Sequence, residues 1–209
     1  MQFLAGTTSD LSRQVVHELA RYRFRVFVER LGWQLPCEPG IEFDGFDRPD
    51  TVYVMARSEP GQIVGCARLL PTTAPYLLSH VFPELLKGCA LPCSPQVWEL
   101  SRFAAMDLED DATSNFGITS SSAAVALLRA SMRVAYERGA SELVTVSPLG
   151  IERLLRRAGF EARRFGPAML IGEHWLFACR IAVTTKDAAS AGHRRPKLDP
   201  LSSLVDVTT

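Results

Sequence analysis

The chain has 209 residues, of which 47% are hydrophobic and 22% are charged, so it is long enough to bury the core of one domain. Lys and Arg together number 23, as do Asp and Glu, and the formal net charge is zero. This balance excludes a protein held on nucleic acid or on an anionic membrane by its overall charge, so a charged partner must bind a local patch.

The N-terminus and the cysteines predict where the protein works. The start, MQFLAGTTSDL, has neither a basic leader nor a long apolar stretch, and no window approaches the roughly 20 apolar residues of a membrane span. The five cysteines include no C-x-x-C pair, as expected of reduced thiols, and the four histidines are scattered. We therefore expect a cytoplasmic protein that holds no metal.

The first predicted element is an amphipathic helix from Asp10 to about Glu29, because apolar residues recur there at spacings of three and four. Ser9 or Asp10 is its expected N-cap. Residues 31–50 mix Gly, Pro, acids and aromatics without periodicity, which predicts a long loop of the kind that often carries function.

The rest of the chain alternates predicted strands and helices. A turn-forming SEPG segment joins the first two strands, which predicts an antiparallel hairpin, and Gly139 and Gly159 are expected to end two of the helices. This order predicts an α/β three-layer sandwich around a mixed central sheet, as one domain over residues 1–185 with a mobile tail at 186–209. The predicted strands are 51–57, 62–69, 96–103, 143–146 and 175–183, and the predicted helices are 77–86, 120–138 and 149–158.

Two segments place charged and aromatic residues where a plain core would not need them. Arg23 and Phe27 are four apart and share one face of the first helix, although a solvated basic face beside a core phenylalanine would look the same. The loop holds Trp33 and then EFDGFD, with Asp44 and Asp47 three apart. Ordinary turn chemistry would also account for these two acids.

The charges inside the predicted strands are harder to explain by a plain core. Arg68 interrupts an apolar run and needs a partner. In VWELSRF, alternation predicts that Trp98, Leu100 and Arg102 face one side, and that Glu99, Ser101 and Phe103 face the other. Burial of Glu99 would raise its pKa, as in a catalytic base, whereas an ion pair with an arginine such as Arg68 would be a structural alternative.

Together these residues resemble the pattern of the LuxI-type acyl-homoserine-lactone synthase family, which reads Arg-x-x-x-Phe, Trp, Asp-x-x-Asp, Arg and Glu-x-x-Arg. The segment LVTVSPLGIERLLRRAGF resembles the family's second half. The matching residues are Arg23, Phe27, Trp33, Asp44, Asp47, Arg68, Glu99 and Arg102, with Phe82 at a further aromatic position. The resemblance implies the fold of GCN5-related acetyltransferases and an enzyme that makes an N-acyl-homoserine lactone quorum-sensing signal.

The implied substrates are S-adenosylmethionine and an acyl chain carried on acyl carrier protein, with methylthioadenosine released and no cofactor. Glu99, Asp44 and Arg68 are then the catalytic candidates, with Glu99 the favoured base and Asp44 the alternative. Trp33, Phe27 and Asp44 would attract the sulfonium nucleoside. Arg23 and Arg102 would orient its carboxylate, while Asp47 and Arg68 would also tie the loop to the sheet.

The acyl group and its carrier make further demands. Backbone amides of Ser101 and Phe103 are candidates for holding the oxyanion. The resemblance places an apolar tunnel between the strands around Glu99 and LVTVS, lined by residues such as Leu100, Met132, Val146 and Leu149. Ser147 in place of threonine favours an unsubstituted acyl chain, and a chain of medium length is a separate expectation. The acidic carrier protein would dock on a basic surface, which a solvated helix end would also explain; its arginines are Arg153, Arg156, Arg157, Arg163 and Arg164.

Two other functions stay open at this point. An ordinary acetyl-CoA N-acetyltransferase of the GCN5-related fold would need a Gln/Arg-x-x-Gly-x-Gly/Ala loop for the pyrophosphate, but the chain has the acidic AAMDLEDDATSNFG there, which disfavours CoA. A non-catalytic regulatory module that binds S-adenosylmethionine or an acyl compound would have no need of Glu99.

Overall fold

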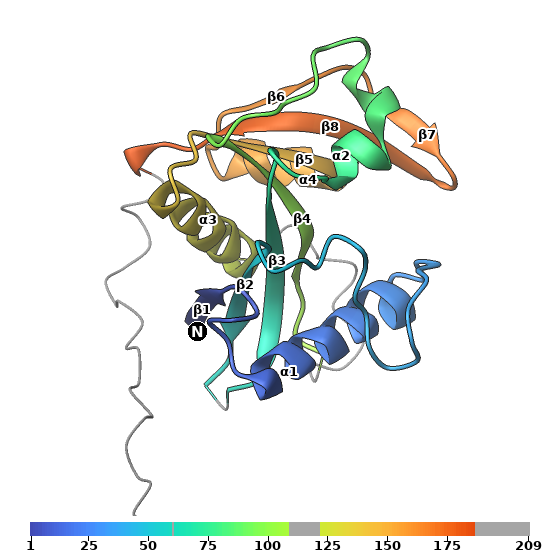
Figure 1. The fold of residues 1–209 in the computed structure, drawn as a ribbon. Helices are drawn as coiled ribbons and strands as arrows, with labels where there is room; N and C mark the ends of the chain where they lie inside the picture. Colours follow the sequence, from blue (N-terminus) through green and yellow to red (C-terminus); the bar gives the residue numbers. More distant parts are fainter. Residues whose placement is uncertain (60, 109–121, 187–209) are drawn as a thin grey trace, which may run out of the picture.

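The computed structural model describes residues 1–59, 61–108 and 122–186, which form an eight-stranded sheet between helices (Figure 1). The strand order is β1-β2-β3-β4-β5-β8-β6, with β7 paired to β8. β4 and β5 pair in parallel, and the other strand pairs in these ranges are antiparallel, so the sheet is mixed as predicted. The strands are β1 Gln2–Gly6, β2 Val52–Arg57, β3 Ile63–Pro71, β4 Val97–Ala105, β5 Glu142–Pro148, β6 Ala162–Arg164, β7 Met169–Ile171 and β8 His174–Ala182.

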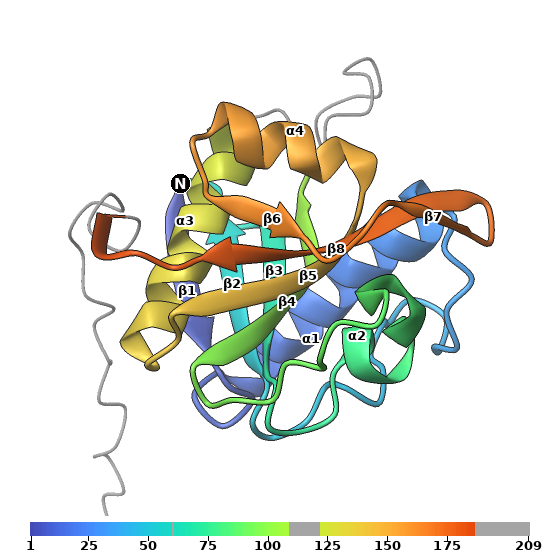
Figure 2. The same cartoon turned by 90° about the horizontal axis from the view of Figure 1, so that it is seen from above.

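Helices cover both faces of the sheet. α1 and α2 pack on one face and α3 and α4 on the other, and Figure 2 shows α2 and α4 on opposite sides of β5 and β8. The described part of the chain holds no helix that is both long and apolar enough to cross a membrane. The helices are α1 Arg13–Arg23, its π-helical continuation η1 Phe24–Arg30, α2 Leu77–His80, the 3₁₀ turn η2 Pro83–Leu86, α3 Ser122–Glu137 and α4 Leu149–Arg157.

Both faces of the central strands are buried. On the α3 face, Gly65 of β3 lets the helix pack closely, since a Cβ there would lie 3.2 Å from a methyl carbon of Leu127. On the α1 face, Leu19 and Val26 pack against Tyr53 of β2. The same face also carries buried charged side chains, which need partners inside the protein.

The predicted boundaries are correct to within two residues for the hairpin, for α4 and for the end of α3, but not for the first two helices. α1 begins at Arg13 with Ser12 as its N-cap, because the carboxylate of Asp10 instead accepts hydrogen bonds from Thr7. The helix predicted at 77–86 is two separate turns, since Pro83 cannot continue the first. Gly139 and Gly159 end their helices with positive φ, as predicted.

Three short strands, β1, β6 and β7, were not predicted. Each has five residues or fewer, so its period is too brief to stand out, and each takes its place by pairing with a longer strand. Residues 109–121, with most of the acidic segment and the predicted start of α3, and the predicted tail beyond residue 186 lie outside the described residues.

Candidate active site

An ion cluster lies between α1, the loop of residues 31–50 and the sheet. It consists of three arginines and three acids: Arg23, Glu42, Asp44, Asp47, Arg68 and Arg102. Their side chains are all at most 16% exposed, and their charges balance. Such pairing and hydrogen bonding offset the cost of taking charged groups out of water.

Arg23 is held entirely by carboxylates of the loop. Its Nε donates to Glu42 Oε2 at 2.5 Å, and its two terminal nitrogens donate to Asp47 at 2.7 and 3.0 Å. Burial alone would lower the pKa of Arg23, but Asp47 and Glu42 outweigh it and raise that pKa. Burial likewise opposes ionisation of Asp47, yet Arg23 and Arg68 hold the pKa of this carboxyl well below its usual range.

The other two arginines share the remaining acid. Asp44 accepts from Arg68 Nη1 at 2.6 Å and from Arg102 Nη2 at 2.7 Å, so both of its oxygens already bind guanidinium groups. Arg102 also donates to Glu42 Oε1 at 3.0 Å. These bonds engage both oxygens of Asp44, so it is a poorer candidate for a base than a carboxylate that no guanidinium contacts.

Glu42 is the member of the cluster that sequence reasoning missed. It is fully buried and bridges Arg23 to Arg102. The signal was present in IEFDGFD, where Glu42 alternates with Phe43 beside Asp44, but an acid in a loop is normally solvated.

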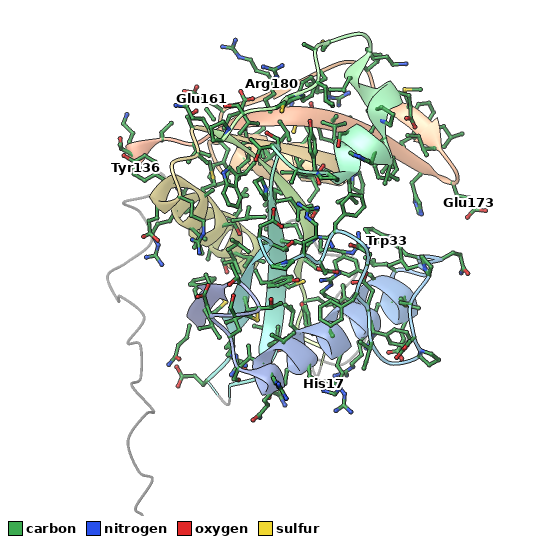
Figure 3. All side chains as sticks on the ribbon, in the orientation of Figure 1. His17, Trp33, Tyr136, Glu161, Glu173 and Arg180 are labelled. Atoms are coloured by element: carbon green, nitrogen blue, oxygen red, sulfur yellow. The ribbon has the colours of Figure 1, made fainter. Side chains whose placement is uncertain are left out.

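Two aromatic residues lie against the cluster. The rings of Phe27 and Trp33 are 4.9 Å apart, and the guanidinium of Arg102 lies 5.6 Å from the first ring and 5.8 Å from the second. Phe27 is 1% exposed, whereas Trp33 is half-buried. Figure 3 shows Trp33 above the C-terminal part of the first helix and His17 below its N-terminal part.

A β-bulge in β4 changes the predicted alternation. Ser101 pairs with Arg68 and Ala104 with Cys66, so two residues of β4 oppose one of β3, and Arg102 takes a φ of 46°. Arg102 consequently points to the same face as Glu99 and Ser101, toward the ion cluster. The prediction that it would share a face with Leu100 is wrong, and Phe103 instead packs on the α3 face with Leu100.

Glu99 is the buried carboxylate that no guanidinium contacts directly in the described structure. It is 1% exposed, and its oxygens accept backbone hydrogen bonds from Leu77 at 2.9 Å and Leu78 at 2.7 Å. Burial raises its pKa to about 7, although these bonds and the more distant Arg68 and Arg102 oppose the rise. The carboxyl can therefore exchange a proton near neutral pH.

Arg68 does not form the ion pair with Glu99 that the structural alternative required. It bonds to Asp44, Asp47 and Ser101 Oγ. Its Nη2 is buried and has no hydrogen-bond partner in the part of the chain that the structure describes. A buried guanidinium nitrogen without a partner suits an anionic group of a substrate.

β4 and β5 separate just beyond Glu99. They pair over Val97–Glu99 and Glu142–Val144, although both strands continue for several residues (Figure 1). Ser101, Arg102 and Phe103 on one strand and Val146 and Ser147 on the other therefore flank a widening gap in the ladder. Ser147 is buried, and its hydroxyl lies 3.0 Å from that of Thr145.

The residues expected to line an acyl tunnel do not form one group. Leu100 and Met132 are buried in the core under α3, whereas Val146 packs in the core under α2, where Phe82 also lies. Leu149 is 40% exposed at the start of α4 and lines neither core. Because alternation sends Val146 to the face opposite Leu100, these residues lie on both faces of the sheet, and the tunnel that they were expected to line stays a prediction.

A separate cleft of about 640 Å³ lies between α1 and the β2–β3 hairpin. Its lining includes Glu18, Arg21, Tyr22 and Arg57 and none of the candidate residues above. Glu99, the ion cluster and the point where β4 and β5 separate lie outside this cleft. The chemistry of these residues, and not the volume of a cleft, therefore locates the candidate site.

Comparisons with known proteins all indicate one family. The family model described as "Autoinducer synthase" matches residues 7–190. An acyl-homoserine-lactone synthase of Acinetobacter nosocomialis is 49% identical over 183 residues, 88% of this chain and 100% of that protein.

Solved structures agree as well. TofI, in a ternary complex with an inhibitor and MTA, is 44% identical with a TM-score of 0.76, covering 88% of this chain and 92% of that one. BjaI, a CoA-dependent acyl-homoserine lactone synthase with SAM and isopentyl-CoA, is 27% identical with a TM-score of 0.75, covering 88% and 84%. An acyl-CoA N-acyltransferase from Pseudomonas aeruginosa, 18% identical with a TM-score of 0.57, shares the fold alone; it covers 87% of this chain and 99% of its own.

Proposed function

Because this chain belongs to the autoinducer synthase family and is therefore an acyltransferase of the acyl-homoserine-lactone synthase type, we propose that it acylates S-adenosylmethionine from an acyl-[acyl carrier protein] and closes the product to an N-acyl-homoserine lactone. S-adenosylmethionine is a substrate in this reaction and leaves as methylthioadenosine. The observation that carries the proposed site is Glu99, a buried carboxyl with a pKa of about 7 where β4 and β5 separate.

In the first step Glu99 removes a proton from the ammonium group of S-adenosylmethionine, directly or through one water. The freed amine attacks the thioester carbonyl, the carbon–sulfur bond breaks, and the carrier thiol leaves with a proton. The bulge at Arg102 takes backbone amides of that segment out of the regular ladder with β3, which supports Ser101 and Phe103 as the stretch that holds the oxyanion.

In the second step the substrate carboxylate attacks the carbon that bears the sulfonium, which closes the ring and expels methylthioadenosine. We assign orientation of this carboxylate to Arg68, whose Nη2 lacks a partner in the described residues. Arg102 remains a second candidate from the other side of the cluster. Arg23, bonded to Glu42 and Asp47, has the role of fixing the loop.

The sulfonium and its nucleoside need an aromatic face and nearby negative charge. Trp33 is half-buried and Asp44 is the most exposed acid of the cluster, so these two residues suit the cation best. Phe27 supports Trp33 from beneath, because its own ring is covered. Phe82 and Val146, which share the core under α2, belong to the acyl side of the proposed site.

The proposed donor is the carrier protein rather than CoA. Exposed arginines on α4 and β6 suit an acidic protein, and the reaction would run in the cytoplasm, where both substrates are made. Acyl-CoA is the second candidate, since the similar BjaI is CoA-dependent. Asp107 is the first acid of the segment thought to repel CoA, and the next three lie outside the described residues.

The test is to incubate the protein with S-adenosylmethionine and either acyl-[acyl carrier protein] or acyl-CoA of several chain lengths. Methylthioadenosine and lactone are followed by mass spectrometry. Equal amounts of both products with the carrier-bound donor are expected, and faster turnover with acyl-CoA would overturn the donor assignment. Binding of S-adenosylmethionine without product from any donor would favour the regulatory-module alternative.

A further inference from the structure

The carboxylate of Glu99 is held by the start of a very short helix. Leu77 N–H donates to Oε2 and Leu78 N–H donates to Oε1, so two consecutive backbone amides form a fork around the carboxylate. α2 spans four residues, Leu77–His80, and one turn has few internal bonds to keep its first amides aligned. Side chains must therefore hold the turn in shape.

Ser79 supplies this support. Its Oγ donates to the carbonyl of Tyr76 at 2.7 Å and accepts from the Tyr76 amide at 3.3 Å, which closes the backbone directly before Leu77. Nδ1 of the exposed His80 lies 2.6 Å from the same oxygen. One hydroxyl thus fixes both backbone groups of the residue that precedes the fork.

Tyr76 is itself fixed to the strand that carries Glu99. It is 1% exposed, and its hydroxyl donates to the carbonyl of Pro92, in the segment that leads into β4. Thr72 bonds to Ser94 and to the Val97 carbonyl in the same segment. The fork and the base therefore sit in one connected unit, with Ser79 as the link closest to the amides.

We propose that Ser79 is a positioning residue for Glu99, because its hydroxyl holds the first turn of α2 so that two amides stay aimed at the carboxylate. The inference rests on the proposed function in taking Glu99 as the base. Ser79 itself has no contact with reacting atoms in this assignment.

The charged and titratable groups around Glu99 set the direction of the effect. Arg68 on β3 and Arg102 on β4 lower the pKa of Glu99 from a distance, Tyr76 faces it with Cys93 nearby, and His80 is the titratable residue of α2. The two amide bonds also lower this pKa against the effect of burial. Loosening the turn weakens these bonds, so the pKa of Glu99 rises and less base is ionised at neutral pH.

The test compares Ser79→Ala with the unchanged protein over a range of pH, following methylthioadenosine because the lactone ring opens in alkali. A rise of about one pKa unit lowers kcat/KM about fivefold at pH 7 and leaves it nearly unchanged at about pH 9. The amine of the substrate titrates identically in both proteins. Ser79→Thr keeps the hydroxyl and should restore the profile, and Thr73→Ala, at an exposed position of the same segment, serves as control.

A second measurement needs no turnover. Carbon-13 NMR of the Glu99 carboxyl, assigned by its loss in Glu99→Gln, gives the pKa of that group directly in each protein. The expected result is a higher pKa in Ser79→Ala than in the unchanged protein. An equal pKa, or a rate that falls by the same factor at every pH, overturns the inference.

The two proposals fail in different ways. If no donor gives methylthioadenosine, the proposed function fails while the carboxyl titration still reports on the turn. If the unchanged protein turns over normally, but Ser79→Ala shifts neither the pKa of the Glu99 carboxyl nor the rise of kcat/KM with pH, only the positioning role of Ser79 is overturned. Ser79→Cys, which keeps a weak donor, gives the same comparison if Ser79→Ala does not fold.

Discussion

Glu99 receives its hydrogen bonds from backbone amides and lies at the point where β4 and β5 separate. Replacing it with Gln removes the proton acceptor while keeping the size of the side chain. We expect turnover to fall by about 100-fold or more, as when a general base is lost, with binding of methylthioadenosine retained. Calorimetric binding beside a product assay checks this, and unchanged turnover would exclude Glu99 as the base.

The pH dependence follows from the same residue. Burial raises the pKa of Glu99 to about 7, and the base must be ionised to accept a proton. The rate should therefore rise with pH through about 7 and lose its dependence above that range. Initial rates of methylthioadenosine release between about pH 5 and 9 measure this rise of the rate with pH. A midpoint near the ordinary pKa of about 4.3 for Glu would contradict the assignment of Glu99 as the base.

Glu42 gives a prediction about stability. Its carboxylate is fully buried between Arg23 and Arg102, so Glu42→Gln leaves two buried cations short of an anion. We expect a loss of about 3 kcal/mol or more in the free energy of unfolding, measured by denaturant titration. Asp50→Asn is the control, since Asp50 pairs with Arg48 at the surface and should cost less than about 1 kcal/mol.

At the scale of single residues, the sequence could predict most members of the ion cluster, but it could not predict which face of the sheet each side chain occupies. Spacing and resemblance singled out Arg23, Asp47 and Arg68, and the ion cluster contains all of them. Glu42 was missed because burial of a loop acid depends on distant arginines. The face of Arg102 was wrong because a bulge, set by pairing with β3, has no signal in the strand's own alternation.

At the scale of elements, α1 is tied to the end of β4 through one side chain. The hydroxyl of Tyr22 donates to the Met106 carbonyl at 2.9 Å and accepts from the Met106 amide at 3.1 Å. Tyr22→Phe should lower the free energy of unfolding by about 1 kcal/mol, because the Met106 carbonyl loses this partner. Thermal unfolding measures the change.

The control for that prediction is Tyr136→Phe, since Tyr136 is 42% exposed at the outer end of α3 (Figure 3). An equal effect of both substitutions would mean that the hydroxyl of Tyr22 contributes nothing specific to the attachment of α1. A larger effect of Tyr22→Phe alone would show that this attachment stabilises the helix that carries Arg23.

Long periodic elements could be predicted, and elements defined by their neighbours could not. The stripe of α1 and the SEPG hairpin depend on local spacing and turn chemistry, so they stand out in the sequence. The π-helical continuation η1 depends on packing of Phe27 and Val26 against the sheet, which extends the turn after Arg23. Edge strands such as β1 need a partner strand before they form.

At the scale of the whole molecule, the predicted family and fold are confirmed by the family model and by the similar solved structures. The zero net charge hides an uneven surface. α4 and β6 carry exposed arginines, and in the described residues Arg164 already pairs with Glu152. Arg153 and Arg157, four apart on α4, are therefore the clearer candidates for contact with an acidic carrier.

Replacing both Arg153 and Arg157 with Glu reverses the local charge. If the carrier protein docks on α4, kcat/KM for acyl-[acyl carrier protein] should fall about tenfold or more at low salt, with a smaller difference at high salt, because steering between exposed charges is screened. Acyl-pantetheine carries the same thioester without protein or phosphates, so its rate should stay unchanged. Replacing both Arg13 and Arg21 with Glu, at exposed positions of α1, makes the same change in net charge and serves as the control. An equal loss of kcat/KM with both donors would mean that the substitutions impair the enzyme itself. No loss with either donor would mean that the carrier protein docks on another surface.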